Sequence, residues 1–142
     1  MKILFLLGTL FLSGFAVLAE DFLYLECSTV TRAVFRERKT QELINEQSKD
    51  ETLYLKIDIR NNRFMSHKNS TWDEAKIDGS KLKAVINKRE NGLLATGNLE
   101  IDIDPAGQFN SEMNFTAWAI SIKMDINGQC IAVDESVFNQ MK

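Results

Sequence analysis

The sequence contains few of the residues from which reactive sites are built. It has two cysteines, Cys27 and Cys130, and one histidine, His67. A zinc site combines several cysteine and histidine ligands at short spacings, which this set does not provide. The chain also has no glycine-rich phosphate-binding loop and no nucleophile elbow. We therefore expect a protein that is not an enzyme and that holds no cofactor.

The chain also lacks an excess of positive charge and, beyond its beginning, a long apolar run. Its 142 residues include 17 Lys and Arg against 20 Asp and Glu, a net charge of −3. Nucleic-acid binding favours a basic face, so we expect no nucleic-acid partner. A spanning helix needs roughly 20 apolar residues, and no segment after residue 19 approaches that length.

The first 19 residues have the pattern of a secretory signal peptide. Lys2 precedes an apolar stretch over residues 3–17, and the small residues Val17 and Ala19 occupy the cleavage-determining positions before Glu20. The alternative is a membrane anchor, for which the apolar stretch is short. We expect a signal peptide at residues 1–19 and a single secreted β-domain at residues 20–142, located in the periplasm or outside the cell and without a transmembrane anchor after cleavage.

In an exported protein an even pair of cysteines predicts a disulfide, here between Cys27 and Cys130. The alternative is a pair of free, buried thiols. The bridge would close a loop of about 100 residues, and the chain-entropy model values such a bridge at up to ~4–5 kcal/mol.

Apolar and polar residues alternate through most of the chain, which predicts strands with one buried face. The alternation covers residues 22–30, 53–60, 93–104 and 108–117. In the second of these, Ile59 falls on the apolar face and Asp58 on the polar one. The apolar phase then moves to even positions, which predicts a bulge or a break near residues 117–119.

Turn residues separate these segments. Asp78-Gly79 and Asn91-Gly92 predict two-residue hairpin turns. Asp104-Pro105-Ala106-Gly107 predicts a type I turn with Asp104 in its first position.

Three stretches allow two interpretations each. Residues 31–50 fit either a helix or a strand pair, and we favour strands. Asn127-Gly128 fits either a hairpin turn or a glycine bulge inside one continuous strand, and we favour the strand. Residues 134–142 fit either one helical turn capped by Asp134 or a frayed end.

Six to eight strands joined by short turns predict an all-β fold, an antiparallel meander forming a small barrel or partial barrel with at most one short helix. In a meander that closes on itself the first and last strands become neighbours. The predicted disulfide would join those two strands, which explains why one cysteine lies near each end of the chain.

Two groups of residues are candidates for a site. Glu100, Asp102 and Asp104 lie ~7 Å apart on one face of a strand and could contribute to a calcium site or meet a basic partner. The interpretation we favour is the water-facing side of a half-buried strand, because one flat strand cannot surround a calcium ion. His67 and Trp72, in the polar segment 66–76, are candidate partner-binding residues; the alternatives are an ordinary surface histidine and a tryptophan that covers the core.

The arrangement resembles small exported bacterial β-proteins that carry a cysteine in the first mature strand, an I-D-x-x-x-G hairpin and a terminal G-x-C. Here these elements are Cys27, residues 103–107 and residues 128–130. The chain is also similar, more loosely, to the disulfide-tied barrels that inhibit c-type lysozymes. Neither resemblance assigns a functional residue.

These observations favour a non-catalytic binding protein, inhibitor-like in the broad sense, that acts on a macromolecule of the cell envelope. The alternative is a lipocalin-like carrier that holds a small apolar ligand inside the barrel.

Overall fold

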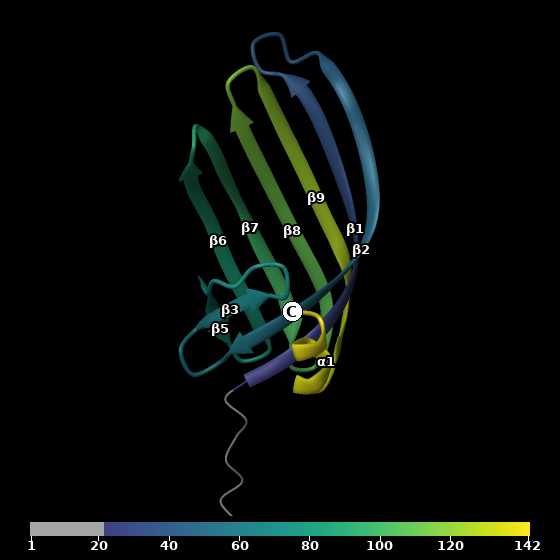
Figure 1. The fold of residues 1–142 in the computed structure, drawn as a ribbon, viewed down its shortest axis with the longest axis vertical. Coiled ribbons are helices and arrows are strands. Elements are labelled where there is room, and N and C mark those ends of the chain that lie inside the picture. Colours follow the sequence, from purple (N-terminus) through teal and green to yellow (C-terminus); the bar gives the residue numbers. More distant parts are fainter. Residues whose placement is uncertain (1–21) are drawn as a thin grey trace, which may run out of the picture.

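The computed structural model describes residues 22–142 and contains nine strands and one short helix (Figure 1). The predicted signal peptide, residues 1–19, lies outside the described residues. The elements are β1 (Phe22–Glu37), β2 (Leu43–Asp58), β3 (Arg63–Ser66), β4 (Asp73–Glu74), β5 (Lys76–Asp78), β6 (Lys81–Glu90), β7 (Leu93–Ile103), β8 (Ala106–Ala117), β9 (Ile120–Ala132) and α1 (Glu135–Gln140).

All nine strands form one antiparallel sheet in the order β4-β3-β2-β1-β9-β8-β7-β6-β5, which confirms the predicted all-β meander. The first and last strands are neighbours, as predicted. The two ends of the sheet, β4 and β5, are separated in the chain only by Ala75, so the sheet curls into a nearly closed barrel. The place where the barrel closes is therefore in the middle of the sequence, whereas β1 and β9 are paired like any other neighbours.

The predicted disulfide is present and joins residues that lie directly opposite each other on β1 and β9. Cys27 and Cys130 are register partners, with an S–S distance of 2.00 Å and a Cα–Cα distance of 4.0 Å. Their exposed fractions are 0% and 3%, so the bridge is part of the core. The alternative of two free thiols is wrong.

The core fills one end of the barrel, which we call the closed half. Its side chains come from alternate positions of the long strands, together with Phe64 of β3. The buried set is Leu25, Cys27, Leu55, Ile57, Phe64, Leu82, Ala84, Leu99, Ile101, Ile103, Phe109 and Cys130. Ile59 was predicted on this face, but it is 38% exposed because β2 ends at Asp58 and the chain turns.

Two of the three ambiguous stretches, residues 31–50 and Asn127-Gly128, are strands. Residues 31–50 form the outer parts of β1 and β2, whose register continues to Arg36 and Leu43. β9 passes through Gly128 without a register shift, so the predicted glycine bulge is wrong. A Cβ on Gly128 would lie 2.2 Å from the Ser28 carbonyl oxygen, so close approach of the neighbouring strand is what requires glycine here.

Of two further predictions for turns, one is confirmed and one is wrong. The phase change near residue 118 is a true break, because Trp118 and Ala119 form the turn between β8 and β9. Asp104 and Pro105 are the two central residues of the turn between β7 and β8, so Asp104 is not in the predicted first position of the turn. The peptide bond between them is cis.

The C-terminal residues form the helix α1, which confirms the interpretation of residues 134–142 as a helical turn rather than a frayed end. Phe138 of this helix is fully buried and lies 5.9 Å from the ring of Tyr24. Asp134 precedes the helix, but its side chain makes no capping hydrogen bond.

Six long strands continue beyond the closed half and form what we call the open half (Figure 1). β3 pairs only with residues 55–58 of β2, and β5 pairs only with residues 81–83 of β6. Within residues 22–142, the remaining parts of β2 and β6 have no neighbouring strand on their outer sides. The open half therefore has two free edges.

The disulfide should contribute strongly to stability because it links residues 103 positions apart. Replacing both cysteines, with Cys27→Ala and Cys130→Ala together, should lower the free energy of unfolding by about 3–5 kcal/mol. Denaturant unfolding of the oxidised protein and the double variant measures this difference. Reductant should destabilise the natural protein and leave the double variant unchanged; equal midpoints in all conditions would contradict the assignment.

Candidate functional site

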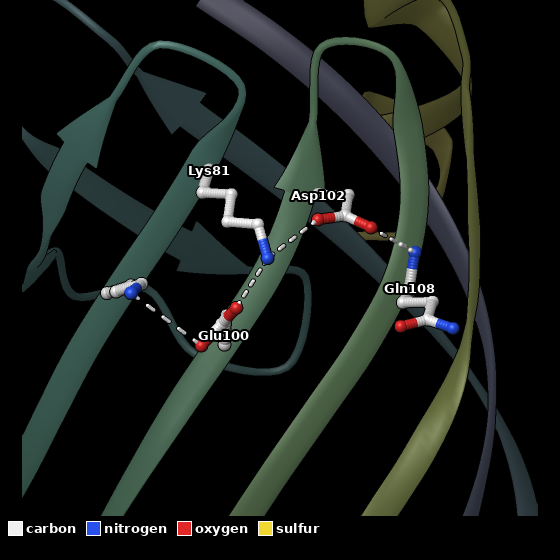
Figure 2. Close-up of polar contacts among 5 residues, drawn as sticks. Lys81, Glu100, Asp102 and Gln108 are labelled. Carbon is white, nitrogen blue, oxygen red and sulfur yellow. Dashed lines mark hydrogen bonds and ion pairs between the residues drawn. The ribbon is translucent and has the colours of Figure 1, made fainter.

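The carboxylates of Glu100 and Asp102 on β7 form ion pairs with lysines of the neighbouring strand β6 (Figure 2). Lys81 Nζ lies 2.7 Å from Glu100 Oε1 and 3.6 Å from Asp102 Oδ1, and Lys83 Nζ lies 3.9 Å from Glu100 Oε2. The backbone N–H of Gln108 donates to Asp102 Oδ2 at 3.1 Å. The hydrogen bond and charge of Lys81 hold the pKa of Glu100 below its usual value, and the same contact raises the pKa of Lys81.

These contacts do not assemble a cation site. Asp104, the third member of the candidate row, lies in the exposed turn after β7. Across residues 22–142, no group of three or more His, Cys, Asp or Glu side chains could hold a metal ion. The row acts as the water-facing side of β7, paired with cations across the strands.

His67 extends the pairing of β2 with β3 by one residue. Its backbone N–H donates to the Tyr54 carbonyl at 2.9 Å, and its ring Nδ1 accepts the Tyr54 backbone N–H at 3.1 Å. The two rings meet edge to face with centroids 5.3 Å apart. The imidazole thus has a defined structural contact, which leaves its candidate role in partner binding without positive support.

Trp72 is half-buried in a cluster of aromatic and cationic side chains. Its ring stacks on Phe22 with centroids 6.5 Å apart, and Arg63 Cζ lies 4.3 Å from its centre. Lys56 Nζ lies 4.5 Å from the Phe22 ring. Phe22 and Lys56 alternate with the buried residues of their strands, so the cluster is on the side of the sheet opposite the core. Such stacked cations are stabilising contacts and also fix the orientation of the ring.

Asp58 holds Arg63 in position beneath Trp72. Its Oδ2 accepts hydrogen bonds from Arg63 Nε and Asn61 Nδ2, both at 2.8 Å, and its Oδ1 accepts the Asn61 backbone N–H at 3.2 Å. Burial raises the pKa of Asp58, but the bonds from Asn61 and Arg63 outweigh it, so the pKa falls below the ordinary 3.8. The alternation placed Asp58 on the polar face and did not predict its burial. Asn61 and Asn62, which follow in the chain, are typical turn residues. They could have indicated that the Asp58 carboxylate accepts hydrogen bonds from the turn.

The outer face of the open half carries a polar hollow of about 680 Å³. Glu112 and Asp125 are register partners there, and Arg32 is the register partner of Asp125 on the other side. The lining residues are Val30, Arg32, Asn98, Glu100, Asn110, Ser111, Glu112, Asp125 and Asn127. The sequence pattern does not reveal this group, because its members come from four strands.

The opposite face of the open half, continuous with the core, is apolar. The strand register places aliphatic, aromatic and methionine side chains side by side there: Met113 is paired with Met124, Phe115 with Ile122, and Ile122 with Phe35. We call this set the apolar face. It consists of Ala33, Phe35, Ile86, Ala95, Met113, Phe115, Ala117, Ile122 and Met124.

The apolar face continues the inside of the barrel, and the covering segment reaches it only in part: Lys68 forms an ion pair with Glu51 of β2, and Asp73 of β4 forms one with Lys88 of β6. Ala33 is buried, and the other members are only half-buried. Figure 1 shows no helix and no second layer of strands over this part of the described sheet. The intervening side chains, such as Asn114 and Thr116, point to the other face. The inner side of the open half is therefore apolar over β1, β9, β8 and β7, and it is bordered by polar residues, Asn45 and Gln47 of β2 and Lys88 of β6.

The Asp58 contacts predict a pH-dependent stability. Because the folded-state pKa is depressed, the contribution of Asp58 should be fully present above its unfolded pKa of about 3.9 and lost as the pH falls through the lower folded value. Asp58→Asn should destabilise the protein by about 1–3 kcal/mol at neutral pH. The side-chain NH2 group of the new asparagine is a donor, and it would face the donors of Asn61 and Arg63 instead of accepting their hydrogen bonds.

Denaturant unfolding between neutral and acidic pH measures both effects. The difference between the natural protein and Asp58→Asn should shrink in acid. Asp134→Asn is the control, because Asp134 is exposed and its side chain caps no helix. A gap between Asp58→Asn and the natural protein that stays constant with pH would contradict the assignment.

No helix among residues 22–142 is long and apolar enough to cross a membrane. Comparison with known protein families, with curated proteins and with solved structures finds no match to this chain.

Proposed function

We propose that this protein is a non-catalytic binding protein that docks a partner protein on the apolar face of the open half. The observation that carries the proposal is the half-buried apolar face itself, which lies between two free strand edges. A sheet with one apolar side normally buries that side against another layer. A partner that supplied this layer would remove the half-buried rings and methionines from water.

The shape of the region favours a protein over a small molecule. The apolar face extends over β1, β9, β8 and β7 as a continuous sheet surface, the geometry of a standard protein interface rather than of an enclosed ligand site. Aromatic and methionine side chains are enriched at the centres of such interfaces. Phe35, Phe115, Met113 and Met124 supply them here.

The free edge of β2 offers a second means of attachment. Residues 43–53 expose backbone donors and acceptors to which a partner strand can add, a common mode of peptide recognition. Glu46, Lys49 and Asp50 lie along this edge, and such charges oppose unspecific edge pairing. We therefore propose that the partner's strand must match these charges.

The alternative function, a carrier with a ligand inside the barrel, has less support. The interior of the closed half is filled by buried side chains, of which Leu25, Ile57, Leu82 and Ile101 are at most 1% exposed. A lipocalin-like carrier needs a hollow at this position. Native mass spectrometry of the purified mature chain distinguishes the two functions, because a carrier would retain an extra small-molecule mass.

The disulfide is compatible with an oxidising compartment, which supports the proposal that the protein acts in the periplasm or outside the cell. The partner would then be an envelope or extracellular protein, and the binding would be inhibitor-like in the sense that it covers a surface of the target.

Neighbouring residues of β8 provide a matched test. A photo-crosslinking amino acid at Phe115 should form an adduct with a protein when the chain is expressed in its native host, whereas the same residue at Asn114, on the polar face, should not. In chains without the crosslinking amino acid, Phe115→Lys should abolish co-purification of the partner that the crosslink identifies. Asn114→Lys should leave that co-purification intact. An adduct between two copies of this chain would identify the partner as a second copy.

Thermal unfolding of both lysine variants is the control for folding. Because residue 115 lies in the open half, outside the buried core cluster, both variants should unfold cooperatively. Equal crosslinking from the two positions, or none from Phe115, would contradict the proposed function.

A further inference from the structure

Three hairpins end side by side at the far end of the open half, away from α1 (Figure 1). They are the β1–β2, β8–β9 and β6–β7 hairpins. The backbone N–H of Arg38 donates to the Ala119 carbonyl at 2.7 Å, which ties the first tip to the second. The Trp118 ring nitrogen lies 3.2 Å from the position of a Cβ on Gly92, which brings the second tip onto the third. The three tips thus form one connected surface.

Large apolar side chains are exposed on all three tips. We call this set the tip patch: Leu43 (55% exposed), Ile44 (56%), Leu93 (38%), Trp118 (85%) and Ile120 (41%). These five residues are half of the ten large apolar side chains that are exposed in residues 22–142. Their concentration at three adjacent hairpin ends separates the tip patch from the scattered exposed apolar residues that are ordinary on a protein surface.

The backbone at Trp118 has an unfavourable conformation. Its φ is +41°, in the first central position of a two-residue hairpin turn where glycine is usual. A bulky residue at positive φ costs free energy, which a buried side chain could offset by packing. Trp118 is almost fully exposed, so packing within the protein does not offset this cost. A contact of the ring with a binding partner would explain why a tryptophan occupies this position.

The charge near the tip patch differs from that of the remaining surface. Residues 36–44, 89–93 and 117–120 contain four basic and three acidic side chains, whereas the rest of the described chain has twelve basic and fifteen acidic ones. The basic residues are Arg36, Arg38, Lys39 and Arg89. The segments at this end therefore carry a net charge of +1, against −3 for the rest of the described chain, and their four cations can meet negatively charged groups.

We propose that the tip patch docks on the surface of an anionic phospholipid bilayer. Trp118 and the four aliphatic side chains enter the headgroup layer, where amphipathic indole rings are most stable. Arg38, Lys39 and Arg89 contact the lipid phosphates, to which cations near the surface are attracted. This inference goes beyond the proposed function and uses residues outside the apolar face.

Trp118 can report on this docking directly. The chain has two tryptophans, so a mature chain carrying Trp72→Phe, which keeps an aromatic ring on Phe22, has Trp118 as its single indole. Vesicles of equal parts phosphatidylglycerol and phosphatidylcholine should shift its fluorescence to the blue, and brominated acyl chains should quench it. Vesicles of phosphatidylcholine alone should bind much more weakly.

Sedimentation with the same vesicles measures the contribution of each residue in the mature chain. Trp118→Gly should weaken binding by about tenfold or more, because a ring's worth of apolar area stays in water. Arg89→Ser and Lys39→Ser should each weaken it by roughly fivefold, with the effect fading at high salt. Val85→Ser is the matched control: Val85 is also 85% exposed but lies on β6, outside the tips, so binding should be unchanged.

Loss of folding cannot explain the expected result for Trp118→Gly, because glycine accepts a positive φ without strain and the melting temperature should not fall. The proposal is overturned if the natural chain does not bind the anionic vesicles, or if Trp118→Gly and Val85→Ser bind equally well. Phe115→Lys should leave vesicle binding unchanged and Trp118→Gly should leave the Phe115 crosslink unchanged, so failure of one proposal is distinguishable from failure of the other.

Discussion

The pairing of β1 with β9, fastened by the Cys27–Cys130 disulfide, is the constraint on which the rest of the structure depends. It places the first and last strands in the centre of the sheet rather than at its edges. The sheet then extends outward in both directions until β4 and β5 meet around Ala75. Because both cysteines are buried, the bridge also contributes to the core that fills the closed half. The open half, with the apolar face and the tip patch, is the part of the six long strands that this closure leaves uncovered.

The sequence was sufficient to predict the long strands, the Asn91-Gly92 turn and the disulfide, because each of these depends on local pattern or on a single pair of residues. The alternation over residues 93–103 predicted the core side of β7, and the Asn91-Gly92 pair predicted the turn before it. Gly128 shows the limit of such reasoning. Local pattern suggested a bulge, but the requirement for glycine comes from Ser28 on another strand, and that contact exists only in the folded sheet.

The same distinction separates the sites that could be predicted from those that could not. Glu100 and Asp102 were correctly placed on one face of a strand, yet the cations that neutralise them come from β6. The alternation predicted that Asp58 faces water. Its burial depends on Arg63, which lies after the turn and donates a hydrogen bond to its carboxylate. The apolar face and the tip patch are invisible to alternation, because it cannot tell which apolar residues of a long strand will be covered. Coverage depends on how far β3, β4 and β5 extend along the sheet.

The position of β9 next to β1 has a consequence for how the chain folds. β1 can pair with β2 as soon as both are available, but its other edge stays open until the last strand arrives about one hundred residues later. Contacts between such distant segments form slowly, and an unpaired strand edge invites association with other chains in the meantime. The polar and charged residues on the outer face of β1, such as Glu26 and Arg32, make that waiting edge less prone to aggregation. Once β1 and β9 have paired, oxidation of the two thiols fixes this late pairing covalently.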